Sequence, residues 1–123
     1  SDIGRKSFPE QLRNVVSIDH YDGVVFIASE LGIVKYDLEL RELNLLFIAG
    51  IYSNKDIYSM KVDEKFIFLG CDNGLIKINK RTGMVSDYEF QFIGRVYDII
   101  VDGKEIWLGT SNGLIKFLWK RHL

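Results

Sequence analysis

The stretch FLGCDNGLIKI at Phe68–Ile78 recurs as WLGTSNGLIKF at Trp107–Phe117 and, more loosely, as FIASELGIVKY at Phe26–Tyr36. Each copy ends with a glycine, two apolar residues, a lysine and a further apolar or aromatic residue. Self-similarity of this kind is the signature of a repeat architecture, in which one supersecondary unit is used several times. The repeat therefore decides the fold class before any single residue does.

The repeat length is that of a β-propeller blade. Gly32 and Gly74 are 42 residues apart, and Gly74 and Gly113 are 39 apart, as in four-stranded propeller blades. The sequence predicts an all-β protein with three four-stranded antiparallel units, forming part or half of a larger ring. We expect one propeller-type domain over residues 1–123, with repeats at about 15–56, 57–95 and 96–123 and with 1–14 as an outer strand that completes a blade.

Short β-branched and aromatic runs alternate with polar or glycine-bearing turns, which indicates strands. The runs predict strands at 15–20, 24–28, 33–37 and 43–48 in the first repeat and at 57–62, 66–70, 75–79 and 84–92 in the second. The turns at 72–74 and 111–113 carry Asn-Gly, which supplies the positive φ of tight hairpins. Only 38–47, LELRELNLLF, has a helix-like composition, and the repeat register favours a strand there.

Composition gives no support for several classes of partner. The 123 residues are 47% hydrophobic and 27% charged, with 16 basic and 17 acidic residues and a net charge of −1. This balance does not favour nucleic acid or an anionic membrane surface, and no apolar run approaches the roughly 20 residues of a membrane span. Cys71 is the single cysteine, so no intrachain disulfide can form. Its counterparts are Ser29 and Thr110, which predicts a small structural residue.

The sequence predicts no enzyme, no cofactor and no metal site. His20 and His122 lie in different repeats without a second metal ligand at a useful spacing, and no nucleophile motif is present. The glycine turns precede strands rather than helices, which argues against a phosphate-binding loop. Lys35, Lys77 and Lys116 recur at one position and could form a ring of charge. The simpler interpretation lays each lysine stem over a neighbouring blade with its ammonium in water.

The candidate ligand-binding residues lie in the turns between the second and third strands. In a propeller these turns emerge on the same face as the connections between blades, a face that commonly binds ligands. We expect five residues to be candidates for ligand contact: Asp72, Asn73, Ser111, Asn112 and Glu30. Turn formation alone would also explain their identity.

The repeat resembles the two-component regulator propeller repeat, which has an aromatic or apolar residue, Leu-Gly-Thr, two polar residues and Gly-Leu. IWLGTSNGLIKF at 106–117 matches it best, whereas the second copy has Phe68 and Cys71 in place of Trp and Thr and the first has Ala28 in place of Gly. The resemblance implies a sensory propeller in the extracytoplasmic or periplasmic part of a bacterial hybrid histidine kinase, with a carbohydrate-type ligand. The alternative is a structural or protein-interaction propeller without a small ligand.

Three blades leave apolar faces to be covered, because repeat units are stabilised by their neighbours. The segment 114–119 is apolar at nearly every position, which suits burial on both faces. We expect self-association as a homodimer, with residues 2–8 completing the third blade of a neighbouring chain. The alternative is that the remaining blades belong to a longer chain.

Overall fold

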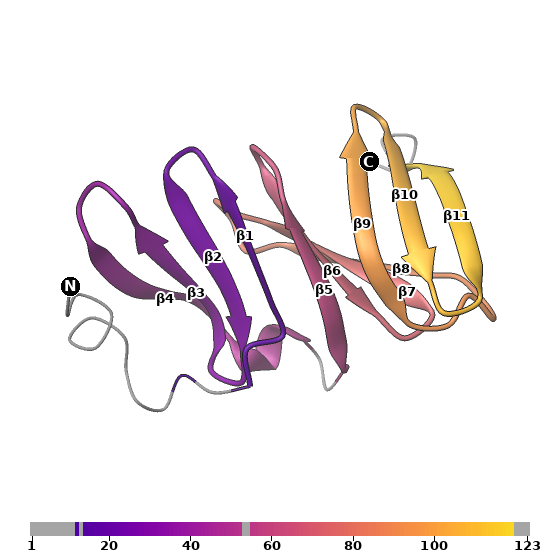
Figure 1. The fold of residues 1–123 in the computed structure, drawn as a ribbon, viewed down its shortest axis with the longest axis horizontal. Helices are drawn as coiled ribbons and strands as arrows, with labels where there is room; N and C mark the ends of the chain where they lie inside the picture. The colour runs from indigo at the N-terminus through magenta and orange to yellow at the C-terminus, as the bar shows by residue number, and fades with distance from the viewer. Residues whose placement is uncertain (1–11, 13, 53–54, 120–123) are drawn as a thin grey trace. The chain divides into compact units, whose positions relative to one another are not determined.

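The computed structural model describes residues 12, 14–52 and 55–119, which form three antiparallel sheets with the strands of each sheet in chain order (Figure 1). This confirms the predicted all-β fold of propeller blades. The chain divides into two compact units, Ser1–Asn54 and Lys55–Leu123. The first unit contains one sheet and the second contains two.

The first unit is a four-stranded sheet followed by a short 3-10 helix. Its elements are β1 (Ser17–Tyr21), β2 (Val24–Ser29), β3 (Gly32–Asp37), β4 (Glu42–Ile48) and η1 (Ala49–Tyr52). The helix-like segment therefore forms strand β4, as the repeat register predicted. The Asp37 carboxylate accepts hydrogen bonds from the backbone N–H groups of Glu39 and Leu40, at 2.9 and 2.8 Å. This turn brings β4 back along β3 and overrides the local helix propensity.

The second unit contains two meander sheets. The first has β5 (Ile57–Val62), β6 (Phe66–Cys71), β7 (Gly74–Asn79) and β8 (Val85–Glu89), and the second has β9 (Val96–Asp102), β10 (Glu105–Thr110) and β11 (Gly113–Leu118). Within the described residues the third repeat thus forms three strands, where the first two form four. Figure 1 shows β9, β10 and β11 side by side.

The β9–β11 sheet packs face to face on the β5–β8 sheet. The core of this contact consists of Phe68, Leu75, Ile93, Val96, Ile99, Ile106, Leu108 and Trp119. The Trp119 ring is 2% exposed and makes edge contacts with Phe66 and Phe68, each at 5.4 Å between ring centroids. Its indole N–H donates to the carbonyl of Gly103 at 3.0 Å. Burial of such side chains stabilises each by about 1.5–3 kcal/mol.

The opposite face of the β9–β11 sheet is open within the described part of the chain. Leu114 is 67% exposed and Ile100 is 61% exposed, whereas Leu75, the counterpart of Leu114 one repeat earlier, is fully buried. We expected residues 114–119 to be buried on both faces. Within the described part of the chain only one face is covered, where Ile115 and Phe117 pack against the β5–β8 sheet.

Two sequence expectations about single residues can be compared with the structure. Cys71 is 1% exposed, and burial raises the pKa of its thiol, as suits a small structural residue. Lys77 differs from the expected solvated lysine, because it is only 5% exposed. Its ammonium lies 4.7 Å from the centre of the Phe66 ring and 5.3 Å from that of Trp119. Cation–π attraction replaces the water we expected around it.

Gly70 tests the face-to-face packing. A methyl group at Gly70 would overlap the Ser59 hydroxyl and approach the Val96 carbonyl oxygen to 2.6 Å, where Ser59 already donates a hydrogen bond. We expect Gly70→Ala to lower the free energy of unfolding by about 1–3 kcal/mol, as measured by urea denaturation.

The matched control is Gly109→Ala, one repeat later. Its added methyl would lie 3.6 Å from the Asp98 Cβ, an ordinary contact, so we expect a change below about 0.5 kcal/mol. Equal losses for the two variants would show that the packing at Gly70 is not the cause.

Candidate functional site

The connection from β8 to β9, residues 90–95, lies against the turns that carry most of the predicted ligand-binding residues. Asn73 exchanges two hydrogen bonds of 2.8 Å with Gly94: its N–H donates to the Gly94 carbonyl, and its side-chain oxygen accepts from the Gly94 N–H. The Asn112 amide donates to the Phe92 carbonyl at 2.9 Å. The β6–β7 and β10–β11 turns therefore share an edge with the connection between blades, as the repeat predicted.

Ser111 holds the same connection from the other sheet. Its backbone N–H donates to the Arg95 carbonyl, and its hydroxyl accepts from the Arg95 N–H, both at 2.9 Å. Asn73, Ser111 and Asn112 thus use side-chain hydrogen bonds to fix the backbone of 90–95. Their side chains therefore have a structural role, and a ligand could contact only those side-chain atoms that remain exposed.

Glu30 occupies the equivalent turn of the first unit. Its carboxylate accepts a hydrogen bond from the Asn14 side-chain amide at 2.6 Å. Because Glu30 belongs to the first compact unit, it is described apart from the other four candidates. The structure brings together Asp72, Asn73, Ser111 and Asn112, all in the second unit.

A cluster of aromatic and charged side chains lies beside these turns, and we call Tyr58, Asp72, Arg95 and Tyr97 the tyrosine–arginine cluster. The Tyr58 hydroxyl donates to the Asp72 carboxylate at 3.1 Å. The Tyr58 and Tyr97 rings meet edge to face, with centroids 6.1 Å apart, and the Arg95 guanidinium lies 5.5 Å from the Tyr58 ring centre. Tyr97 is 47% exposed, so the cluster presents ring surface to solvent.

The surroundings of Tyr58 and Arg95 raise the pKa of each side chain, which favours a neutral phenol and a charged guanidinium. Desolvation raises the pKa of Tyr58, and its hydrogen bond to Asp72 raises it further. The hydrogen bond to Tyr97 raises the pKa of Arg95. The cluster consequently offers a neutral phenol, a fixed positive charge, a carboxylate and two aromatic rings to a ligand.

Sequence reasoning did not select Tyr58, Arg95 or Tyr97 as site residues. The two tyrosines are 39 residues apart and stand second in the innermost strands β5 and β9. That recurrence is visible in the sequence. In a repeat protein, residues of the same type at equivalent positions of adjacent repeats can lie next to each other in space. Their pairing with Asp72 and Arg95 depends on the path of the 90–95 connection, which no local pattern specifies.

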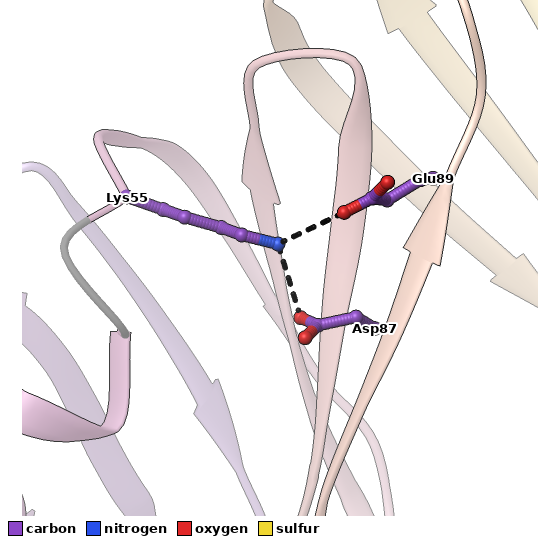
Figure 2. Close-up of polar contacts among 3 residues, drawn as sticks. All are labelled: Lys55, Asp87 and Glu89. Atoms are coloured by element: carbon purple, nitrogen blue, oxygen red, sulfur yellow. Dashed lines mark hydrogen bonds and ion pairs between the residues drawn. The ribbon is translucent and has the colours of Figure 1, made fainter.

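A second polar contact ties the start of the second unit to its outer strand. The Lys55 ammonium lies 3.2 Å from the Asp87 carboxylate and 4.0 Å from that of Glu89 (Figure 2). The Lys55 side chain is 29% exposed and the two acidic side chains are 47% and 80% exposed. Partly exposed ion pairs of this kind contribute about 1 kcal/mol or less, so their main effect is to set local charge.

Among the described residues no group of three or more histidine, cysteine, aspartate or glutamate side chains could hold a metal ion. His20 is exposed on β1, and His122 lies outside the part of the chain that the structure describes.

Comparison with known proteins supports the fold. No family model matches the chain, and no curated protein matches its sequence. The fold is similar to the extracellular domain of BT4673 from B. thetaiotaomicron, assigned to the hybrid two-component systems, with a TM-score of 0.68 and 24% identity over 94% of this chain and 16% of that chain. Another structure of that domain gives a TM-score of 0.67 and 23% identity over 93% and 15%.

A further similar structure is the N-terminal domain of Nup159, with a TM-score of 0.63 and 15% identity over 86% of this chain and 28% of that chain. The present chain spans only about a sixth of the BT4673 extracellular domain described above. At these identities the likeness establishes the fold, which is that of β-propeller blades.

Asn73 tests the clamp on the blade connection. It has φ of 55° and accepts the hydrogen bond from Gly94, so Asn73→Ala removes an acceptor and strains a left-handed residue. We expect a loss of about 1–3 kcal/mol in the free energy of unfolding. Asn73→Asp keeps an acceptor and tolerates this φ, and its loss in a denaturation series should be smaller. If aspartate and alanine are equally destabilising, the side-chain acceptor is not what fixes the connection.

Proposed function

We propose that this chain is a non-catalytic, ligand-binding section of a sensory β-propeller. The observation that carries the proposal is the tyrosine–arginine cluster, which collects two rings and two opposite charges on the edge shared by the turns and the blade connection. The likeness to an extracellular domain of a two-component system and the resemblance of the repeat support a sensor in a bacterial signalling receptor.

The chemistry of the cluster suits a carbohydrate. Sugar rings present apolar C–H faces that pack on aromatic side chains, and their hydroxyls bond to carboxylates and guanidinium groups. Tyr97 offers its half-exposed ring, while Asp72 and Arg95 offer an acceptor and several donors. Asn73 and Asn112 border the cluster and would add contacts at its rim.

The proposed location is extracytoplasmic, and it rests on the same likeness to an extracellular domain. No helix in the described part of the chain is long and apolar enough to span a membrane.

Substitution in the cluster tests ligand binding. Binding to a panel of neutral and uronic-acid-containing oligosaccharides is measured by calorimetry, with backbone amide shifts to locate the site. We expect Tyr97→Ala and Arg95→Ala each to weaken binding about tenfold or more, because both remove a central contact.

The control is Met84→Ala, which alters a 72% exposed side chain in the β7–β8 turn, at the opposite end of the strands from the β6–β7 turn that carries Asp72. It should bind as the unmodified chain does. Unchanged binding by Tyr97→Ala would place the ligand elsewhere, and a chain that binds no member of the panel would contradict a carbohydrate ligand.

The open face of the β9–β11 sheet favours a second role, that of a protein-interaction surface. Trp107 lies opposite Ile100 and Lys116, with Leu114 further along β11. The counterparts of Trp107 and Leu114 in the β5–β8 sheet, Phe68 and Leu75, are fully buried. We propose that a second copy of the chain covers this face as a homodimer. Further blades of a longer chain are the alternative occupant.

Leu114→Glu tests this second role, since a buried unpaired carboxylate is costly at an interface. Light scattering should give twice the chain mass of 14.2 kDa for the unmodified chain and a single chain mass for the variant. Met84→Glu serves as the control and should remain dimeric. A monomeric unmodified chain would contradict the homodimer and favour further blades of a longer chain.

A further inference from the structure

The outer edge of β11 is open to an added strand. Among the described residues β11 pairs only with β10, whereas the equivalent strands β3 and β7 each have a fourth strand on their other side. The backbone N–H and C=O groups on this edge of 113–118 therefore form a template for β-strand addition.

A groove of about 460 Å³ lies beside this edge. It is lined by Ser86, Asp87, Tyr88, Glu89, Phe90 and Phe117. The Phe117 ring centre is 4.9 Å from that of Phe90 and 5.6 Å from that of Tyr88. Asp87 and Glu89 alternate with Tyr88 along β8, so the pleat directs their carboxylates to the other face of the sheet, where they share Lys55 (Figure 2). Aromatic faces suit a cationic side chain, arginine above all.

The other two sheets give the register of the added strand. In both, the fourth strand has an aromatic residue opposite the residue that follows the repeat glycine: Phe47 lies opposite Ile33, and Tyr88 opposite Leu75. Leu114 is the counterpart of these two partners in the third repeat. A strand that completes the third blade is thus expected to place an aromatic side chain opposite Leu114.

The N-terminal sequence, which lies outside the described residues up to position 11, contains a segment of this kind. Val16, Tyr58 and Tyr97 occupy one position in the three repeats. The two aromatic residues that lie opposite the residue after the repeat glycine stand at similar distances before this position: Tyr88 is 9 residues before Tyr97, and Phe47 is 11 before Tyr58. Phe8 is 8 residues before Val16. The sequence Arg-Lys-Ser-Phe-Pro at 5–9 therefore has the spacing of a blade's outer strand.

We infer that residues 5–9 of a second copy add to the free edge of β11 as its fourth strand. In the β7–β8 register, Phe8 lies opposite Leu114 and extends the open apolar face. Arg5 then lies opposite Phe117, over the aromatic groove. This inference rests on the proposed homodimer and specifies how its two copies exchange strands.

The other neighbours in this register are compatible with the added strand. Lys6 falls opposite Lys116, whose ammonium is already balanced by the Glu105 carboxylate at 3.6 Å. Pro9 falls at the end of the strand, opposite Gly113, and proline is tolerated on edge strands because a missing N–H there faces outward.

Disulfide trapping tests the inference on the full chain. Cys71→Ser provides a cysteine-free background that follows the serine of the first repeat. Two single variants in this background, Phe8→Cys and Leu114→Cys, are mixed and oxidised, because directly opposed residues have Cβ atoms about 4.5–5.5 Å apart. We expect a covalent dimer with one chain of each kind on a non-reducing gel.

The matched control replaces Leu114→Cys by Ile115→Cys, which the pleat places on the other face of the sheet. It should cross-link at least about tenfold more slowly to Phe8→Cys, because its side chain points away from that of residue 8. Equal rates for the two mixtures would overturn the register. A disulfide only within one chain, seen when both cysteines are on the same chain, would overturn the exchange between copies.

Light scattering separates this inference from the proposed homodimer. A dimer of the unmodified chain that gives no Phe8–Leu114 cross-link would overturn the strand exchange and leave docking of the open face intact. Arg5→Glu gives a second readout that does not depend on cysteine. It should weaken the dimer a few-fold, because a carboxylate replaces the cation over the Tyr88, Phe90 and Phe117 rings, and Arg5→Lys should retain most of the dimerisation. Unchanged dimerisation in Arg5→Glu would count against the groove contact.

Discussion

Packing of the β9–β11 sheet on the β5–β8 sheet is the interaction on which the second unit depends. Trp119 follows β11 and buries its ring against Phe66 and Phe68 of β6, while its indole N–H is satisfied by the Gly103 carbonyl. The three strands of β9–β11 bury one apolar face against the β5–β8 sheet. The two sheets of the second unit therefore stabilise each other, as neighbouring units do in other repeat proteins.

This packing also creates the tyrosine–arginine cluster. With the two sheets in contact, the inner strands β5 and β9 lie close enough for Tyr58 and Tyr97 to meet. The connection at 90–95 must then pass across the sheet edge, where Asn73 and Ser111 bond to its backbone. Arg95 is placed beside Tyr58 by those bonds. The tyrosine–arginine cluster is thus a consequence of how one blade leads to the next.

The sequence predicted the elements of the fold well, and it selected one of the four residues of the tyrosine–arginine cluster. The repeat register identified β4 although 38–47 has a helix-like composition, because register reflects tertiary pairing that propensity ignores. Asp72 was selected from its turn and lies in the cluster. Tyr58 and Tyr97 were not selected, since each looks like an ordinary strand residue, and only contact between two sheets brings them together. The path of a connection is a long-range property that turn chemistry does not encode.

Residues at equivalent repeat positions in the two sheets of the second unit have different environments. This difference shows which surface of the third blade is left uncovered in the described part of the chain. Lys77 is enclosed by aromatic rings from both sheets. Among the described residues, Lys116 contacts Trp107, at 5.3 Å from the ring centre, and Glu105, both from its own sheet. The repeat sequence around the two lysines is nearly the same. Since the β5–β8 face is stable when covered by a neighbouring sheet, the same residue types on β9–β11 are suited to the same cover. Exposed apolar faces of this kind mark interaction sites in proteins generally, and this is the basis of the proposed homodimer.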